Sequence, residues 1–203
     1  DERHDYGDRG GGGMITNSKY VSLLTTAAFA GAYNAIPSIV AAYGMRRLRT
    51  VYTGNLLRIR RSSDNAEQDI GYVANGDLDT AAVTAFVGGG SGYIVNWYDQ
   101  SGSAYTASQS TAASQPLYVA SGQNGKPVGR WDGANDYLQK TGLSLPQPNT
   151  IFVVGKLNLT DQDYLFVDGV TGGARNLLLS RTSGSVWSIF AGAEIQGGIT
   201  NTS

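Results

Sequence analysis

Hydrophobic and polar residues alternate in short runs along most of the chain, and turn-forming residues separate the runs. Leu57 and Ile59 alternate with Arg58 and Arg60, which is the two-residue period of a strand with one buried face. Many short strands between Gly-, Asn- and Asp-rich turns are typical of an antiparallel sandwich or jelly roll. The chain is therefore predicted to be all-β, with further strands at residues 92–98, 116–120, 127–131, 137–140, 150–157, 164–168, 176–181 and 185–191.

Two segments break this strand pattern and predict short helices. Residues 18–35 are apolar and alanine-rich, and Pro37 ends any helix there by residue 36. Residues 79–87 form the second candidate helix, since Asp79 suits an N-cap and the glycines at 88–90 suit its end.

The predicted domain order has three parts. Residues 1–13 are charged and then glycine-only, so they are expected to form a flexible arm. Residues 14–40 form the apolar, helical lead-in, and residues 41–203 form a lectin-like jelly roll.

Charge is sparse and unevenly placed. Charged residues make up 15% of the chain and the net charge is −1, which disfavours a nucleic-acid partner. Six arginines lie between residues 46 and 61, and six acids follow between residues 64 and 99. We expect the two blocks to neutralise each other, with a phosphate-binding patch as the alternative.

Several site classes are disfavoured by composition. The chain has no cysteine and one histidine, His4, which argues against thiolate chemistry and histidine-bound zinc. We expect no metal and no cofactor, although calcium on Asp and Asn side chains stays open. No apolar run reaches the roughly 18 to 20 residues of a membrane span, so no membrane partner is expected.

Aromatic rings beside carboxylates and amides mark the candidate carbohydrate site. Aromatic faces can stack on sugar rings, and polar side chains can orient the hydroxyl groups, although the same residues also serve as core packing and turn caps. The candidates are Trp97, Tyr98, Asp99, Gln100, Trp131, Asn135 and Asp136.

A series of motifs carries a family resemblance. They lie at residues 43–54, 57–70, 74–79, 97–102 (Trp-Tyr-Asp-Gln-Ser-Gly), 115–116, 124–128 and 131–138 (Trp-Asp-Gly-Ala-Asn-Asp-Tyr-Leu). Their order resembles the amino-terminal part of the α-L-arabinofuranosidase B catalytic domain, and also lectin-like domains of that type in bacteriophage structural proteins. The resemblance spans about residues 41–195 and implies a concanavalin A-like lectin/glucanase jelly roll.

The family's catalytic residues are only partly matched. Retaining glycoside hydrolysis needs two carboxyl groups about 5 to 5.5 Å apart. The resemblance offers Glu194 as a weak candidate nucleophile, one residue out of register, and the family's acid and its cysteine pair have no counterpart. A one-residue slip in a strand turns the side chain to the other face. The chain is therefore expected not to be an enzyme.

The resulting functional prediction is a non-enzymatic virion structural protein of a tailed phage, as a capsid decoration or tail-associated protein. Its expected partners are other virion proteins, a second copy in a homo-oligomer and a cell-surface glycan, and its expected location is the virion surface. A stand-alone carbohydrate-binding module and an arabinofuranosidase-like glycoside hydrolase remain as alternatives.

Overall fold

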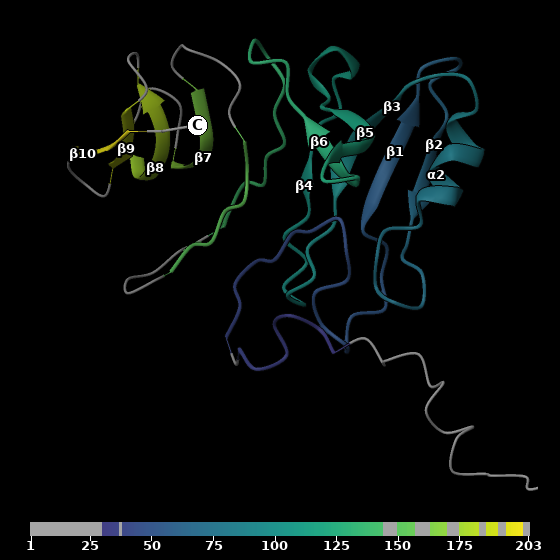
Figure 1. Cartoon of the computed structure of the whole chain (residues 1–203), viewed down its shortest axis with the longest axis horizontal. Coiled ribbons are helices and arrows are strands. Elements are labelled where there is room, and N and C mark those ends of the chain that lie inside the picture. Colours follow the sequence, from purple (N-terminus) through teal and green to yellow (C-terminus); the bar gives the residue numbers. More distant parts are fainter. Residues whose placement is uncertain are drawn as a thin grey trace, which may run out of the picture.

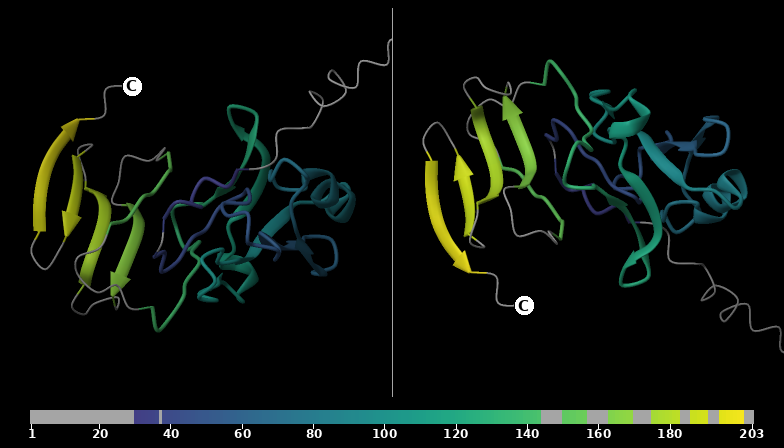
Figure 2. Two further views of the ribbon diagram at one scale, coloured as in Figure 1. Left: turned by 90° about the horizontal axis from the view of Figure 1, so that it is seen from below. Right: turned by 90° about the horizontal axis from the view of Figure 1, so that it is seen from above.

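Over its described residues, the chain forms two antiparallel sheets and one short α-helix. The computed structural model describes residues 30–36, 38–143 and 150–156, and the strands at 163–169, 175–182, 186–190 and 194–200. In all three views, helix α2 and the second sheet lie at opposite ends of the molecule (Figures 1 and 2). The all-β class is confirmed, and the arrangement is consistent with a β-sandwich.

The first sheet has the strand order β2-β1-β3-β5-β6, and β4 also pairs with β3. All of its pairings are antiparallel, and a bulge displaces the β1–β3 register between Arg58 and Ile59. Its strands are β1 (Leu57–Arg61), β2 (Glu67–Ile70), β3 (Gly92–Trp97), β4 (Ala107–Ser108), β5 (Leu117–Gln123) and β6 (Lys126–Arg130).

The second sheet is a simple antiparallel meander in the order β10-β9-β8-β7. It follows the first sheet in the sequence, and each strand pairs with the next along the chain. Its strands are β7 (Asp163–Gly169), β8 (Arg175–Thr182), β9 (Val186–Phe190) and β10 (Glu194–Thr200).

Helix α2 (Thr80–Val87) confirms the second predicted helix. The Asp79 carboxylate accepts a hydrogen bond from the Ala82 amide at 2.9 Å, and Gly88 follows with a positive φ of 58°. The helix buries Val83 against the first sheet. A 3-10 turn, η2 (Ala112–Ser114), is the other short helical element of the first region.

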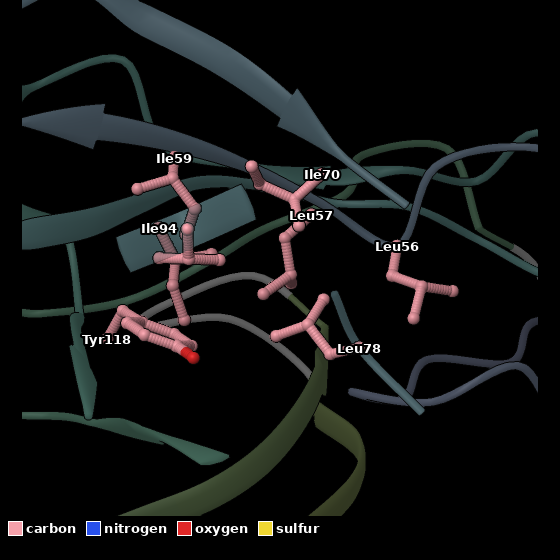
Figure 3. Packing of buried hydrophobic residues seen from close by; sticks show 8 residues of the cluster. Leu56, Leu57, Ile59, Ile70, Leu78, Ile94 and Tyr118 are labelled. Carbon is pink, nitrogen blue, oxygen red and sulfur yellow. The ribbon is translucent and has the colours of Figure 1, made fainter. Parts of the chain in front are cut away.

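The core lies between the first sheet and α2. Leu57 and Ile59 of β1 are fully buried, and they pack with Ile94 of β3 and Tyr118 of β5 (Figure 3). Burying a side chain of this size stabilises the fold by about 1.5 to 3 kcal/mol. A Cβ at Gly92 would lie 3.0 Å from Ile59 Cγ2, so glycine lets the chain pass close to the core there.

The opposite face of β1 carries Arg58 and Arg60, as the alternation predicted. Arg58 donates to both carboxylate oxygens of Asp69, at 2.7 and 2.9 Å. Arg61 pairs with Asp64 at 2.6 Å. The basic and acidic blocks therefore neutralise each other at these positions. Arg60 differs, because its hydrogen-bond acceptors among the described residues are all neutral.

Some predicted elements are absent or outside the described residues. Residues 137–140 contribute one isolated bridge, between Gln139 and Ser108, instead of a strand. Residues 150–156 form no strand, and Phe152 and Val154 are 78% and 103% exposed. The arm at 1–13 and most of the lead-in at 14–40 lie outside the described residues. The described part of that lead-in, residues 30–36 and 38–40, has turns and no helix, and the domain division stays a prediction.

Candidate carbohydrate site

The predicted site residues separate into four groups, and the first group is buried. Asp99 is 6% exposed and its carboxylate accepts four hydrogen bonds. One oxygen accepts from the backbone amides of Ala42 at 2.8 Å and Ser101 at 2.9 Å. The other accepts from the Ser101 hydroxyl at 2.6 Å and the Tyr105 amide at 3.0 Å. This carboxylate fastens the preceding loop to the sheet and has little surface left for a ligand.

Gln100 has the same fastening role. It is 1% exposed, and its side-chain oxygen accepts from the Leu48 amide at 2.8 Å. Its amide nitrogen donates to the carbonyls of Gly44 at 3.2 Å and Arg46 at 2.9 Å. Buried polar groups are stable only when they are paired in this way. Both donor and acceptor sides of Gln100 are therefore used within the fold.

Tyr98 belongs to a second group, on the polar face of the first sheet. Its hydroxyl donates to Asp69 at 2.7 Å, beside the Arg58–Asp69 pair. The hydrogen bond from Arg58 lowers the pKa of Asp69, and burial raises the pKa of Tyr98. The two shifts keep Asp69 ionised and Tyr98 protonated at neutral pH. Neither residue is therefore suited to transfer a proton there.

Trp97 and Trp131 form the third group together with Tyr43. The ring centroids of Trp97 and Trp131 are 6.3 Å apart, and those of Trp97 and Tyr43 are 6.2 Å apart. Trp97 packs against the core, and its buried indole nitrogen has no hydrogen-bond partner among the described residues. Trp131 is 41% exposed. Trp97 thus links the core to Trp131, whose ring lies partly at the surface.

Gly129 sets the position of the Trp131 ring. A Cβ at this residue would lie 3.0 Å from two ring carbons of Trp131 and 3.1 Å from Ile94. That separation is tighter than ordinary carbon contact, which is about 3.5 to 4.0 Å. Glycine at 129 therefore lets the indole lie against strand β6.

A compact turn follows Trp131 and holds the other two candidates. One Asp132 oxygen accepts from the backbone amides of Ala134, Asn135 and Asp136, at 2.8 to 3.2 Å. The Asp136 carboxylate in return accepts from the Asp132 amide at 3.0 Å. Gly133 has a φ of 77°, which suits the turn. Asp132 and Asp136 thus lie side by side on the surface.

The two carboxyl groups have opposite electrostatic environments. Hydrogen bonds from the backbone amides, first that of Ala134, lower the pKa of Asp132. Burial, together with the charge of Asp132, raises the pKa of Asp136. Pairs of carboxyl groups with pKa values shifted apart are the arrangement that acid–base catalysis uses.

Tyr137 is a surface residue that the sequence did not single out. It is 46% exposed and follows the turn directly, where the sequence indicated a strand. The motif at 131–138 contains it, but the exposure of its ring depends on the turn that ends at Asp136 and is not visible in the motif. We define the Trp131 surface as Trp131, Asp132, Asn135, Asp136 and Tyr137. It combines two exposed aromatic rings with two carboxyl groups and an amide, which can stack on a sugar ring and bind its hydroxyls.

Glu194 is the first residue of β10, where it pairs with Phe190 of β9. Its side chain lies outside the described residues, so its candidacy stays a prediction. Within the described part of the chain, no cluster of three or more His, Cys, Asp or Glu side chains could hold a metal ion. Over that same part, no helix is long and apolar enough to cross a bilayer.

Comparison with known proteins identifies what the first sheet resembles. Residues 31–128 match the family model for the catalytic domain of α-L-arabinofuranosidase B. This segment is just under half of the chain, and it includes the Asp99 and Gln100 contacts and most of the first sheet. No curated protein matches the chain.

Two solved structures are also similar. One is an arabinofuranosidase complexed with arabinofuranosyl-α-1,2-xylobiose, at 24% identity and a TM-score of 0.41 over 50% of this chain. Another is a GH54 α-L-arabinofuranosidase soaked with a cyclic sulfate inhibitor, at 24% identity and a TM-score of 0.40 over 51% of this chain. The chain spans about a quarter of the length of each, 24% in both cases.

These comparisons correct two predictions. The expectation that the chain is not an enzyme is wrong, because the family that matches is defined by a catalytic domain. The expectation of a virion or capsid decoration protein is wrong as well, since the match is to a carbohydrate-active domain. Self-association, partners and location are tested by none of these findings and stay predictions.

Proposed function

We propose that this chain carries part of an arabinofuranosidase-like glycoside hydrolase domain that binds its carbohydrate at the Trp131 surface. The observation that carries the proposal is an exposed indole next to two carboxyl groups with pKa values shifted apart. This surface follows directly on the segment similar to an arabinofuranosidase catalytic domain. The proposed substrate class is an oligosaccharide with α-L-arabinofuranosyl branches.

In the proposed reaction, Trp131 stacks on a sugar ring and Asn135 binds a hydroxyl group. Asp136 is the described carboxyl group best suited to donate a proton to the leaving glycosidic oxygen, because its raised pKa keeps it protonated to higher pH. A second carboxylate must then attack the anomeric carbon or activate water. Glu194 is the sequence candidate for that role.

The test is turnover of 4-nitrophenyl α-L-arabinofuranoside and binding of arabinoxylan oligosaccharides by the purified chain. Loss of aromatic stacking, worth about 0.5 to 1.5 kcal/mol, should weaken oligosaccharide binding by Trp131→Ala up to roughly tenfold. Asp136→Asn and Glu194→Gln should lower kcat with little change in binding. Phe152→Ala removes another exposed ring outside this surface, 78% exposed, and should change neither quantity.

Three outcomes would overturn the proposal. Absence of both turnover and binding by well-folded protein would remove it altogether. Binding without turnover would leave a carbohydrate-binding domain and refute the hydrolase. An equal effect of Phe152→Ala and Trp131→Ala would place the binding site elsewhere.

A further inference from the structure

Arg60 is a buried arginine whose partners are all neutral. It is 8% exposed and lies on the polar face of β1. Its guanidinium donates to the side-chain oxygens of Gln115 at 2.6 Å and Asn65 at 2.8 Å, and to the Ala112 carbonyl at 3.3 Å. It also stacks over the Tyr93 ring at 4.7 Å. Among the described residues, no carboxylate pairs with it.

This arrangement differs from that of the nearest arginine on the same face. Arg58, two residues earlier, pairs with Asp69 and lies beside Glu67. A buried charge is costly unless hydrogen bonds compensate it. Arg60 obtains that compensation largely from one loop, residues 109–115, which supplies two of its three acceptors.

The same loop holds the Trp131 surface from its other side. The Tyr137 amide donates to the Ser114 carbonyl at 3.2 Å. In the amide orientation that satisfies its neighbours, Asn135 donates to the Ala113 carbonyl at 3.3 Å. Within the loop, the Gln115 side chain that receives Arg60 also donates to the Gln109 carbonyl at 2.9 Å. Hydrogen bonds from Arg60 on one side and from Asn135 and Tyr137 on the other thus converge on adjacent residues of one short loop.

We infer that Arg60 is a positioning residue for the Trp131 surface, acting through loop 109–115. Its planar guanidinium fixes Gln115 and the Ala112 carbonyl at once, which a lysine cannot do because its ammonium is a single point of charge. The loop carbonyls at 113 and 114 then hold the turn that follows Trp131. The hydrogen bonds alone support the effect of Arg60 on the loop and the turn. The effect on substrate binding rests on the proposed function.

The decisive measurement is hydrogen exchange of the Tyr137 amide in the whole chain. Arg60→Gln removes the guanidinium group with its several donors, and Arg60→Lys keeps the positive charge without the planar group. Losing a hydrogen bond worth about 1 to 1.5 kcal/mol should accelerate exchange roughly tenfold in Arg60→Gln, with a smaller change in Arg60→Lys. Arg58→Gln is the matched control, because Arg58 lies on the same strand and face and contacts another strand. It should leave the Tyr137 amide unchanged.

A kinetic readout separates positioning from general damage. If the proposed function holds, Arg60→Lys should raise KM for an arabinoxylan oligosaccharide several-fold and leave kcat nearly unchanged. Equal acceleration of Tyr137 exchange in the Arg58 and Arg60 variants would overturn the inference, and so would no acceleration in either Arg60 variant. In a different outcome, Tyr137 exchange accelerates only in the Arg60 variants while the wild-type chain neither binds nor cleaves sugar. That result would keep the positioning role and reject the proposed function.

Discussion

Replacing Asp99 by asparagine tests whether the Trp-Tyr-Asp-Gln-Ser-Gly motif is a fastening for the fold. The Asp99 carboxylate accepts from three backbone amides and one hydroxyl. In Asp99→Asn, one oxygen can still accept from the Ala42 and Ser101 amides. The new amide nitrogen then faces the Tyr105 amide, so two donors meet and one of them is left without an acceptor.

The expected cost follows from those contacts. One charge-assisted hydrogen bond is lost, and one buried donor is unsatisfied, while the Ser101 hydroxyl can rotate to accept. Together these changes should lower the free energy of unfolding by about 2 to 4 kcal/mol. For a chain of this size, a loss of 1 kcal/mol lowers Tm by roughly 2 to 4 °C.

The assay is urea unfolding followed by tryptophan fluorescence, with the denaturant slope compared between variants. Asp79→Asn is the matched control, because asparagine caps a helix about as well as aspartate and the cost should be near zero. A loss below 1 kcal/mol for Asp99→Asn, or an equal loss in both variants, would refute the fastening role.

Three further predictions concern other parts of the structure. Gly129→Ala should displace the Trp131 ring, change its fluorescence and cost about 1 to 3 kcal/mol, whereas Gly89→Ala, with nothing within 4 Å, should not. Asp69 has a lowered pKa, so its contribution to stability should be lost as pH falls below about 4, and Asp69→Asn should flatten that dependence; an unchanged slope would contradict the pairing with Arg58. Burial raises the pKa of Tyr43 and of Tyr52 to about 12, so stability should fall as pH rises from about 10 towards 12, and tyrosinate absorbance that appears fully near pH 10 in folded protein would disprove this.

Local patterns were sufficient to predict the elements that depend on nearby residues. Helix α2 begins after Asp79 and ends at glycine because capping and chain reversal are decided within a few residues. The alternation in β1 likewise follows from its own side chains. Residues 150–156 carry a strand-like pattern, yet they form no strand in the structure, because pairing depends on a neighbour that the local sequence does not specify.

The candidate site was only partly predictable for a related reason. Asp99, Gln100 and Trp131 are residue types that occur in sugar-binding sites and also in cores and turns. Their exposure in the fold decides which of these roles each one has. Asp99 and Gln100 bind backbone groups more than 50 positions earlier in the chain, a relation invisible in a short motif. The motifs at 57–70 and 131–138 contain Arg60 and Tyr137 but do not single them out, since their importance comes from contacts with the loop at 109–115.

The contacts of Asp99 and Gln100 also constrain the order of folding. Each joins positions separated by 57 and 52 residues, and the segment at 42–48 that they hold belongs to no strand. Closing so large a loop costs entropy before any bond rewards it. The segment should therefore dock last, after the turn beyond β3 has formed, and detach first under mild denaturation. A protease that cuts near residues 42–48 would report this partial opening well before the core between β1 and α2 unfolds.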